Sequence, residues 1–257
     1  DIGLRLFQHP ASRNWSYAMD EEKLKSLISS AIDERLNAFF GLRGARLDGG
    51  DLNKFLRLAA AADSADYALK NLSSSMTFNN AKDLLTYAVK NVTFPGLMLE
   101  FGVASGSTIN HIASLLSSTV YGFDSFEGLP EDWRPDFKKG AFARQAPEVR
   151  ANVELVTGYF DASLPSFLSR HAEEISFLHI DCDLYSSTKT VLDLCRYRLR
   201  PGTIVVFDEY FNYVGWREHE YKAFKELMMN LNSSDKISGY EYIGYVPTHQ
   251  QVAVRLH

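Results

Sequence analysis

The sequence feature that most constrains the fold is a change of pattern at Pro95, where short apolar runs begin to alternate with helical segments. Runs that are apolar at every position indicate strands buried on both faces, and alternation with helices indicates right-handed βαβ units. The runs are Leu97–Phe101, Val120–Phe123, Val153–Val156, Ile175–Ile180 and Ile204–Phe207, and the helical segments lie at 107–117, 163–171, 185–198 and 218–231.

The end of the chain adds two further strands, Tyr242–Val246 and Gln251–Val254, joined by a turn at Pro247. We therefore predict an α/β fold with a doubly wound, Rossmann-like, seven-stranded and mostly parallel sheet that ends in an antiparallel hairpin. Residues 93–257 would form this domain. Residues 1–92 read as a helical extension, which either covers the sheet or contacts substrate and a second copy of the chain in a homo-oligomer.

The composition of the chain argues against several classes of protein. The 257 residues include 27 Lys and Arg against 32 Asp and Glu, a net charge of −5, so dedicated binding to nucleic acid is not expected. The two cysteines provide no disulfide framework, which favours a reducing, cytoplasmic setting. No apolar stretch approaches the roughly 20 residues that span a bilayer, and the first residues lack a signal-peptide pattern.

A glycine-rich turn follows the first strand of the sheet. Gly102 and Gly106 allow the backbone to turn tightly, and Ser107 is the expected N-cap of the next helix, whose free N–H groups face a ligand. The second strand ends in Asp124, which is 22 residues after Gly102 and suits the hydroxyls of a ribose. Together they predict a cofactor that contains adenosine, although a ligand-free turn and a solvated acid remain alternatives. Glu100, inside an apolar strand, is expected to face the ligand or a hydrogen-bonding loop.

Acidic residues also end the fourth and fifth strands. Asp181 follows one strand, and Asp208 and Glu209 follow the next, so the three carboxylates should converge at one edge of the sheet. An oxygen-rich set without cysteine suits Mg²⁺ or Ca²⁺, while the alternative is that these acids cap helices. Asp183 is expected to cap the helix at Tyr185, and His179 to be a satisfied core histidine.

These residues resemble the macrocin O-methyltransferase family, in the motifs at 99–107, 122–130, 158–165, 179–188 and 207–216. The resemblance covers residues 76–257. It implies a class I enzyme that uses S-adenosylmethionine and a divalent metal, preferably Mg²⁺, to methylate sugar hydroxyls in natural-product (antibiotic) biosynthesis. Glu209 departs from the commoner pattern, which has a second Asp there.

The resemblance also implies roles for individual residues. The methionine part of the cofactor would lie near Glu100, Gly102, Ser105, Gly106 and Ser107, and Asp124 would take the ribose. Ser125, Phe126, Gly158, Tyr159 and Phe160 would flank the adenine, and Asp181, Asp208 and Glu209 would hold the metal. The lysine base of catechol-type relatives is absent, because Leu184 occupies that position. We predict that Asp181 accepts the proton of the substrate hydroxyl, with His219 as a second candidate base.

Aromatic residues in the loops are candidates for the acceptor site. Trp133, Phe211, Tyr213 and Trp216, with Tyr185, either contact the acceptor or pack the loops onto the core. We expect a small-molecule acceptor, a glycosylated natural product or a nucleotide-sugar. The alternatives are a polyketide or β-lactam hydroxyl as acceptor, an NAD-dependent oxidoreductase, and a non-catalytic cofactor-binding module.

Overall fold

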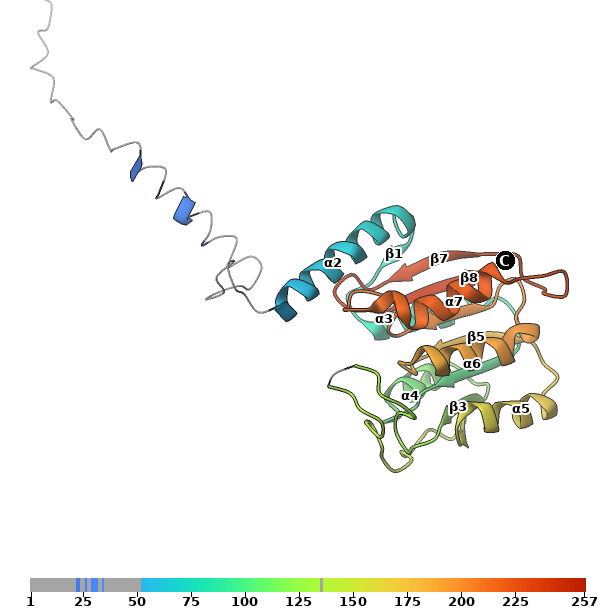
Figure 1. Cartoon of the computed structure of the whole chain (residues 1–257). Helices are drawn as coiled ribbons and strands as arrows, with labels where there is room; N and C mark the ends of the chain where they lie inside the picture. The colour runs from blue at the N-terminus through green and yellow to red at the C-terminus, as the bar shows by residue number, and fades with distance from the viewer. Residues whose placement is uncertain (1–21, 24–25, 27–28, 32–33, 35–51, 135) are drawn as a thin grey trace, which may run out of the picture. The chain divides into compact units, whose positions relative to one another are not determined.

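Eight strands form one sheet in the part of the chain that the computed structural model describes, residues 22–23, 26, 29–31, 34, 52–134 and 136–257 (Figure 1). Their order across the sheet is β1-β7-β8-β6-β5-β2-β3-β4. The bounds are β1 Met76–Thr77, β2 Leu97–Phe101, β3 Val120–Asp124, β4 Val153–Thr157, β5 Ile175–Ile180, β6 Ile204–Phe207, β7 Tyr240–Tyr245 and β8 Val252–Leu256. Only β8 runs against its neighbours, and the other pairings are parallel.

Helices cover both faces of this sheet. The helices are α2 Leu52–Asn71, α3 Ala81–Lys90, α4 Ser107–Ser114, α5 Phe160–Arg170, α6 Tyr185–Cys195 and α7 Glu220–Met229, with short 3-10 turns at Arg196–Arg198 and Trp216–Glu218. Helices α5, α6 and α7 share one apolar core with β2 and β5, which Tyr67 of α2 joins. Helices α3 and α4 share a second core on the other face. Every residue of β2, β5 and β6 is buried, because helices cover both of their faces.

The doubly wound architecture predicted from the sequence is confirmed, with one correction to the strand number. The sheet has eight strands instead of seven, because the two residues of β1 pair with β7 and are too few to show a hydropathy pattern. The compact unit that contains the sheet is Leu56–His257, so the predicted boundary at residue 92 lies inside it. Most of the predicted helix between Leu24 and Phe39 lies outside the described residues. None of the described helices combines the length and apolar character that a membrane crossing requires.

The direction of winding reverses between β2 and β5, which are neighbours in the sheet. From β2 the chain continues outward through β3 and β4, and then it crosses back to β5 and continues the other way to β6. The carboxyl ends of β2 and β5 therefore diverge into loops on opposite sides, which leaves a crevice between them. The candidate functional residues lie at these strand ends.

Candidate functional site

The glycine turn after β2 passes directly over the end of β5. Gly102 has a φ of +93°, and a Cβ added to it would lie 1.7 Å from the carbonyl oxygen of Asp181. Only glycine fits this approach. The expected N-cap Ser107 is wrong, because Gly106 is the N-cap of α4, with a φ of +78° and no side-chain hydrogen bond. The left-handed conformation that ends the turn requires glycine, so α4 begins at Ser107 itself.

Asp124, at the end of β3, ties the second strand to the glycine turn. Its Oδ2 accepts hydrogen bonds from the backbone N–H groups of Val103 (2.9 Å) and Ala104 (2.8 Å). Its Oδ1 accepts from the N–H of Phe126 at 2.7 Å. The carboxylate also lines the cavity described below, so it holds the turn in shape from a position that faces the ligand space. Its predicted contact with a ribose stays a prediction.

Glu100 is fully buried and has polar partners within the protein. Thr108 donates to Oε1 at 2.9 Å, and His179 Nδ1 lies 3.0 Å from Oε2. Burial acts to lower the pKa of His179, but the hydrogen bond and charge of Glu100 outweigh it and the pKa is raised. The expectation of a satisfied core histidine holds at Nδ1 only, because His179 Nε2 is buried without a hydrogen-bond partner. Glu100 has its partners within the protein and does not line the cavity.

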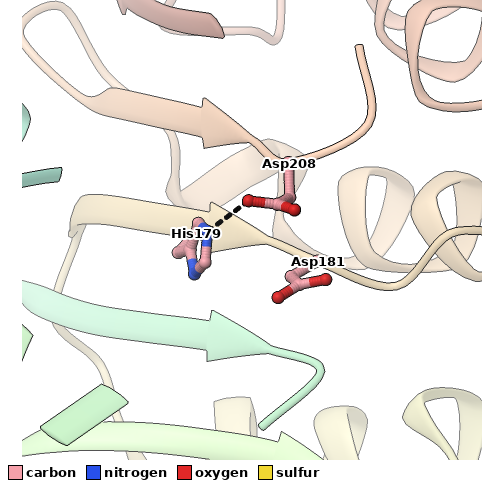
Figure 2. A group of neighbouring side chains, drawn as sticks. All are labelled: His179, Asp181 and Asp208. Atoms are coloured by element: carbon pink, nitrogen blue, oxygen red, sulfur yellow. Dashed lines mark ion pairs between the residues drawn. The ribbon is translucent and has the colours of Figure 1, made fainter. Parts of the chain in front are cut away.

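The carboxylates that end β5 and β6 converge as predicted. The backbone N–H of Asp208 donates to the carbonyl of Ile180, which places the two strand ends side by side. His179, Asp181 and Asp208 form one group whose ligand atoms all lie within 4.8 Å of one another, with His179 Nε2 at 3.9 Å from Asp208 Oδ1 (Figure 2). A second group joins Asp181 to Asp183 and Glu209.

The cluster carries more negative charge than its own protein surroundings stabilise. Burial raises the pKa of Asp181 and of Glu209 well above the usual carboxyl range, and the charge of Asp208 adds to both shifts. Burial also raises the pKa of Asp183 to about 7; Arg134 opposes the shift and Asp208 adds to it. Glu209 Oε2 is buried without a hydrogen-bond partner. Crowded carboxylates of this kind are stabilised by a cation or by protons.

A cavity of about 780 Å³ opens at these strand ends, within the size range of cofactor and substrate pockets. The predicted site residues that line it are Gly102, Asp124, Ser125, Trp133, Tyr159, Phe160, Asp181 and Glu209. The predicted residues outside the lining are Glu100, Ser105, Gly106, Ser107, Phe126, Gly158, Tyr185, Asp208, Phe211, Tyr213, Trp216 and His219. The structure therefore brings Asp124, three of the five residues predicted to flank the adenine, and two of the three metal candidates to one space.

Most of the aromatic residues predicted at the acceptor site pack elsewhere. Phe211 and Trp216 are buried in the core, where the Trp216 ring packs edge-on against Tyr67 and Tyr221. Tyr185 donates its hydroxyl to Glu226 at 2.7 Å. The burial of Phe211 and Trp216, which both follow β6, agrees with the packing interpretation, whereas Tyr185 lies at the start of α6 and is partly exposed. Trp133 does line the cavity.

His219 lies beside the cavity wall. It is the N-cap of α7, and its ring centroid is 6.4 Å from that of Trp133 and 6.0 Å from that of Tyr213. Burial lowers its pKa, and the charge of Arg134 lowers it further. A neutral imidazole can accept a proton, so its role as a base stays a prediction.

The structure adds three functional candidates that sequence reasoning missed. Asp183 lines the cavity with a φ of +61° and does not cap α6, whose N-cap is Leu184. Glu220 is fully buried, and its Oε2 accepts from the N–H of Glu209 at 2.9 Å. Arg134 also lines the cavity. Asp183 could have been found from the sequence, because it alternates with Asp181 after the same strand. No local sequence pattern identifies Glu220 or Arg134.

Arg134 belongs to a segment between β3 and β4 that we call the capping loop, residues 125–134 and 136–144. It folds back on itself, with the Leu129 N–H donating to Ala141 and the Gly140 N–H donating to Leu129. Its side chains reach the rest of the cavity wall at Tyr159, which donates to Glu127, and at Ser186, which donates to Glu131. The capping loop supplies one wall of the cavity, and the strand ends supply the other.

The chain is similar to known methyltransferases. Residues 99–210 match the model of a family described as "Methyltransferase domain". The matched stretch runs from the middle of β2 past the end of β6, and therefore includes the glycine turn, Asp124 and the carboxylate cluster.

Among curated proteins, the chain is similar to 8-demethyl-8-(2,3-dimethoxy-alpha-L-rhamnosyl)-tetracenomycin-C 4'-O-methyltransferase of Streptomyces olivaceus. The two are 29% identical over 157 residues, which cover 50% of this chain and 59% of that enzyme. The match therefore spans less than two thirds of the relative's length. The resemblance to sugar O-methyltransferases of natural-product biosynthesis that the motifs predicted is confirmed.

Solved structures confirm the fold. The calicheamicin methyltransferase CalS11 superimposes with a TM-score of 0.55 at 21% identity, over 97% of this chain and 99% of that chain. The O-methyltransferase NovP gives a TM-score of 0.50 at 21% identity, over 68% of this chain and 78% of that one. The sheet and its helices therefore share the Rossmann-like fold of these two solved structures.

Proposed function

We propose that this chain is an S-adenosylmethionine-dependent O-methyltransferase that methylates a sugar hydroxyl in natural-product biosynthesis. The observation that carries the proposal is that the glycine turn, Asp124 and the carboxylate cluster all face one cavity at the switch point of the sheet. A methyltransferase of this kind needs a donor site and a group that activates the acceptor hydroxyl in the same space. The candidates for these two parts, the glycine turn with Asp124 and the carboxylate cluster, lie on the ends of neighbouring strands.

The donor site would lie over β2 and β3. Asp124 Oδ1 accepts one hydrogen bond, from Phe126, and so has a lone pair left to accept from a ribose hydroxyl, while Tyr159 and Phe160 line the same cavity. S-adenosylmethionine would supply a methyl group on sulfonium, ready for in-line displacement. Holding donor and acceptor in line can contribute roughly 7–11 kcal/mol to lowering the barrier.

The residues at the strand ends fit a divalent cation. The donor set is rich in carboxylate oxygen, the pKa values of Asp181 and Glu209 are raised by burial and mutual repulsion, and Glu209 Oε2 has no hydrogen-bond partner. Asp181, Asp208 and Glu209 would hold Mg²⁺, with Asp183 close to two of them. The ion would lower the pKa of a bound hydroxyl.

On the acceptor side, an alcohol must lose its proton to become a good nucleophile. Asp181, Asp183 and Glu209 are the cluster carboxylates that line the cavity, and of these Asp181 and Asp183 are proposed to accept that proton. His219 is the second candidate, kept neutral by its lowered pKa. The acceptor would be a sugar hydroxyl carried either on a glycosylated natural product or on a nucleotide-sugar. The homo-oligomer predicted from the sequence also remains part of this proposal.

The test separates donor binding from methyl transfer. Calorimetry should show that S-adenosylhomocysteine binds the wild type and the D181N, D208N and E209Q variants, whereas NAD does not bind. Transfer of labelled methyl to sugar acceptors should be lost in all three variants and in EDTA, and Mg²⁺ should restore only the wild type. Methyl transfer that survives both the substitutions and EDTA would exclude the metal, and binding of NAD in place of S-adenosylhomocysteine would exclude the methyltransferase.

A further inference from the structure

Arg134 of the capping loop is held in an unusual environment for a charged side chain. Its guanidinium carbon lies 3.6 Å from the ring centroid of Trp133 and 3.8 Å from that of Tyr213. Two aromatic rings, inclined by 67° to each other, therefore contact the planar cation. The N–H groups at its edge remain available for polar contacts.

Those edge donors are under-used within the protein. Arg134 Nη2 donates to the neutral Gln250 Oε1 at 3.3 Å, and Arg134 Nε is buried without a hydrogen-bond partner. Among the described residues, no carboxylate lies within ion-pair distance of Arg134. The indole Nε1 of Trp133 is likewise buried and unpartnered. The Arg134 side chain lines the cavity, so a cation there without a carboxylate partner suits a ligand with acceptor oxygens.

The charges that line the cavity are separated by element. The acidic lining residues are Asp124, Asp161, Asp181, Asp183 and Glu209, and each of them lies at or just after the carboxyl end of a strand or at the start of a helix. The basic residues among the described lining are Arg134 and Lys139, and both lie on the capping loop. No ion pair in the described part of the chain involves the Lys139 ammonium, whereas its neighbour Lys138 pairs with Asp132 at 3.0 Å. An anionic group would therefore bind at the capping loop and not at the strand ends.

Beside these cations the capping loop presents a row of aromatic rings. Trp133 and Phe137 have ring centroids 5.3 Å apart, and Phe137 stacks on Phe142 at 5.2 Å. All three rings line the cavity. Phe142 remains 43% exposed and has a φ of +68°, a conformation that bulky side chains rarely adopt. A row of rings next to two cations suits a ligand in which a flat ring follows a charged linker.

We propose that Arg134, Trp133 and Lys139 form an anion subsite that binds the diphosphate of a nucleotide-sugar acceptor, with its base against the Phe137 and Phe142 rings. This inference rests on the proposed function, because it puts the sugar of the acceptor at the carboxylate cluster. It selects the nucleotide-sugar over the glycosylated natural product. The chain would then act on a sugar before a glycosyl transfer reaction consumes it.

The experiment uses the full chain saturated with S-adenosylhomocysteine, in EDTA so that no divalent ion bridges phosphate to the carboxylates. The probe is uridine or thymidine diphosphate, titrated by calorimetry at two salt concentrations. Arg134→Gln should weaken binding by about tenfold or more, and Lys139→Gln by a smaller factor, because each loses a charge-assisted hydrogen bond. Arg134→Lys should fall between wild type and Arg134→Gln, since it keeps the charge and loses the planar fork. Binding by the wild type should weaken as salt rises.

Lys138→Gln is the matched control, because it removes the same charge one residue away from Lys139, and Lys138 does not line the cavity. It should bind the diphosphate as the wild type does, and every variant should keep its affinity for S-adenosylhomocysteine. The inference is wrong if the diphosphate does not bind, if the nucleoside without phosphates binds equally well, or if Lys138→Gln loses as much as Arg134→Gln. It is also wrong if Arg134 serves only as a counter-charge to Asp183, in which case Arg134→Gln leaves diphosphate binding unchanged. Failure to bind S-adenosylhomocysteine would contradict the proposed function itself.

Discussion

The carboxylate cluster and the capping loop face the same cavity, but they are held in opposite ways. The cluster sits on strand ends whose backbones continue the sheet ladder, with the Asp181 N–H donating to Phe101 and the Asp208 N–H to Ile180, both at 2.9 Å. The capping loop is held to the rest of the wall by side-chain contacts, such as the exposed hydrogen bonds of Glu127 and Glu131. One wall is part of the core, and the other is attached to the surface.

From this difference we expect the strand ends to serve the chemical step and the capping loop to serve acceptor recognition. Groups on buried strands keep a fixed geometry, which metal binding and proton transfer require. A loop held by solvent-exposed hydrogen bonds opens at a lower free-energy cost, so ligand entry and acceptor choice belong to it. The predictions below compare matched residues in the two regions.

The largest effect is expected for Trp216, in the core, compared with Trp133, on the capping loop. Trp216→Ala should destabilise the fold by about 3–5 kcal/mol, because it empties a fully packed space between Tyr67 and Tyr221. Trp133→Ala should cost about 1 kcal/mol, since its ring is partly exposed, and should instead weaken acceptor binding. Urea unfolding and the acceptor KM measure the two effects, and equal losses of stability would remove the distinction between the regions.

Two glycines with left-handed conformations give the next comparison. Gly102→Ala should cost about 3 kcal/mol or more, because its Cβ would collide with the backbone of Asp181 and force the ends of β2 and β5 apart. Gly140→Ala, in the capping loop, has a φ of +83° and nothing within 4 Å of the added Cβ, so only strain of about 1 kcal/mol is expected. Thermal unfolding of the two variants tests this, and similar midpoints would contradict it.

The third comparison is between a glutamate of the carboxylate cluster and a glutamate that holds the capping loop to the rest of the cavity wall. Glu209→Gln should lower kcat/KM for methyl transfer by about 100-fold, because it removes a charge from the carboxylate cluster while keeping the shape of the side chain. Glu131→Gln, which loses the charge that accepts from Ser186, should change kcat/KM by no more than about threefold. Steady-state kinetics with saturating S-adenosylmethionine distinguishes them. A large loss in both variants would mean that the capping loop takes part in the chemical step.

The smallest effect concerns the internal structure of the capping loop. Asp132 accepts from the Lys139 N–H at 2.9 Å and pairs with Lys138, and these contacts hold its pKa below the ordinary value of 3.8. The contribution of the Asp132 carboxylate to the stability of the capping loop is therefore complete above pH 3.8, and it is lost as the pH falls through the lowered pKa of this group. Asp132→Asn should speed amide hydrogen exchange in the loop at neutral pH, and the difference from wild type should vanish at acid pH. Exchange that is unchanged at neutral pH would show that other contacts order the loop.

The sequence predicted the strand ends well and the loops poorly. The buried strands Leu97–Phe101, Ile175–Ile180 and Ile204–Phe207 were found at their full bounds, because burial on both faces leaves an unbroken apolar run. Asp181, Asp208 and Glu209 follow those runs directly, so their convergence needed only the rule that parallel strands end at one edge.

The positions of the aromatic loop residues could not be predicted from the sequence. Trp133 and Trp216 both follow a strand and look alike in the sequence, yet one lines the cavity and the other is in the core. The path of a loop depends on contacts with distant segments, such as Tyr67 against Trp216, and no local pattern encodes them. The two-residue β1 was missed for the same reason, because it pairs with a strand more than 160 residues away.

By itself, the sequence determined the doubly wound sheet, the glycine turn and the set of acids at its edge, because hydrophobic periodicity and the residues that directly follow each strand are local properties of the chain. The tertiary structure alone decided that Asp183 and Glu220 join the cluster, and that Arg134 contacts the rings of Trp133 and Tyr213. These contacts join segments that are far apart in the chain. Their energies depend on burial and distance, which only the packed fold defines.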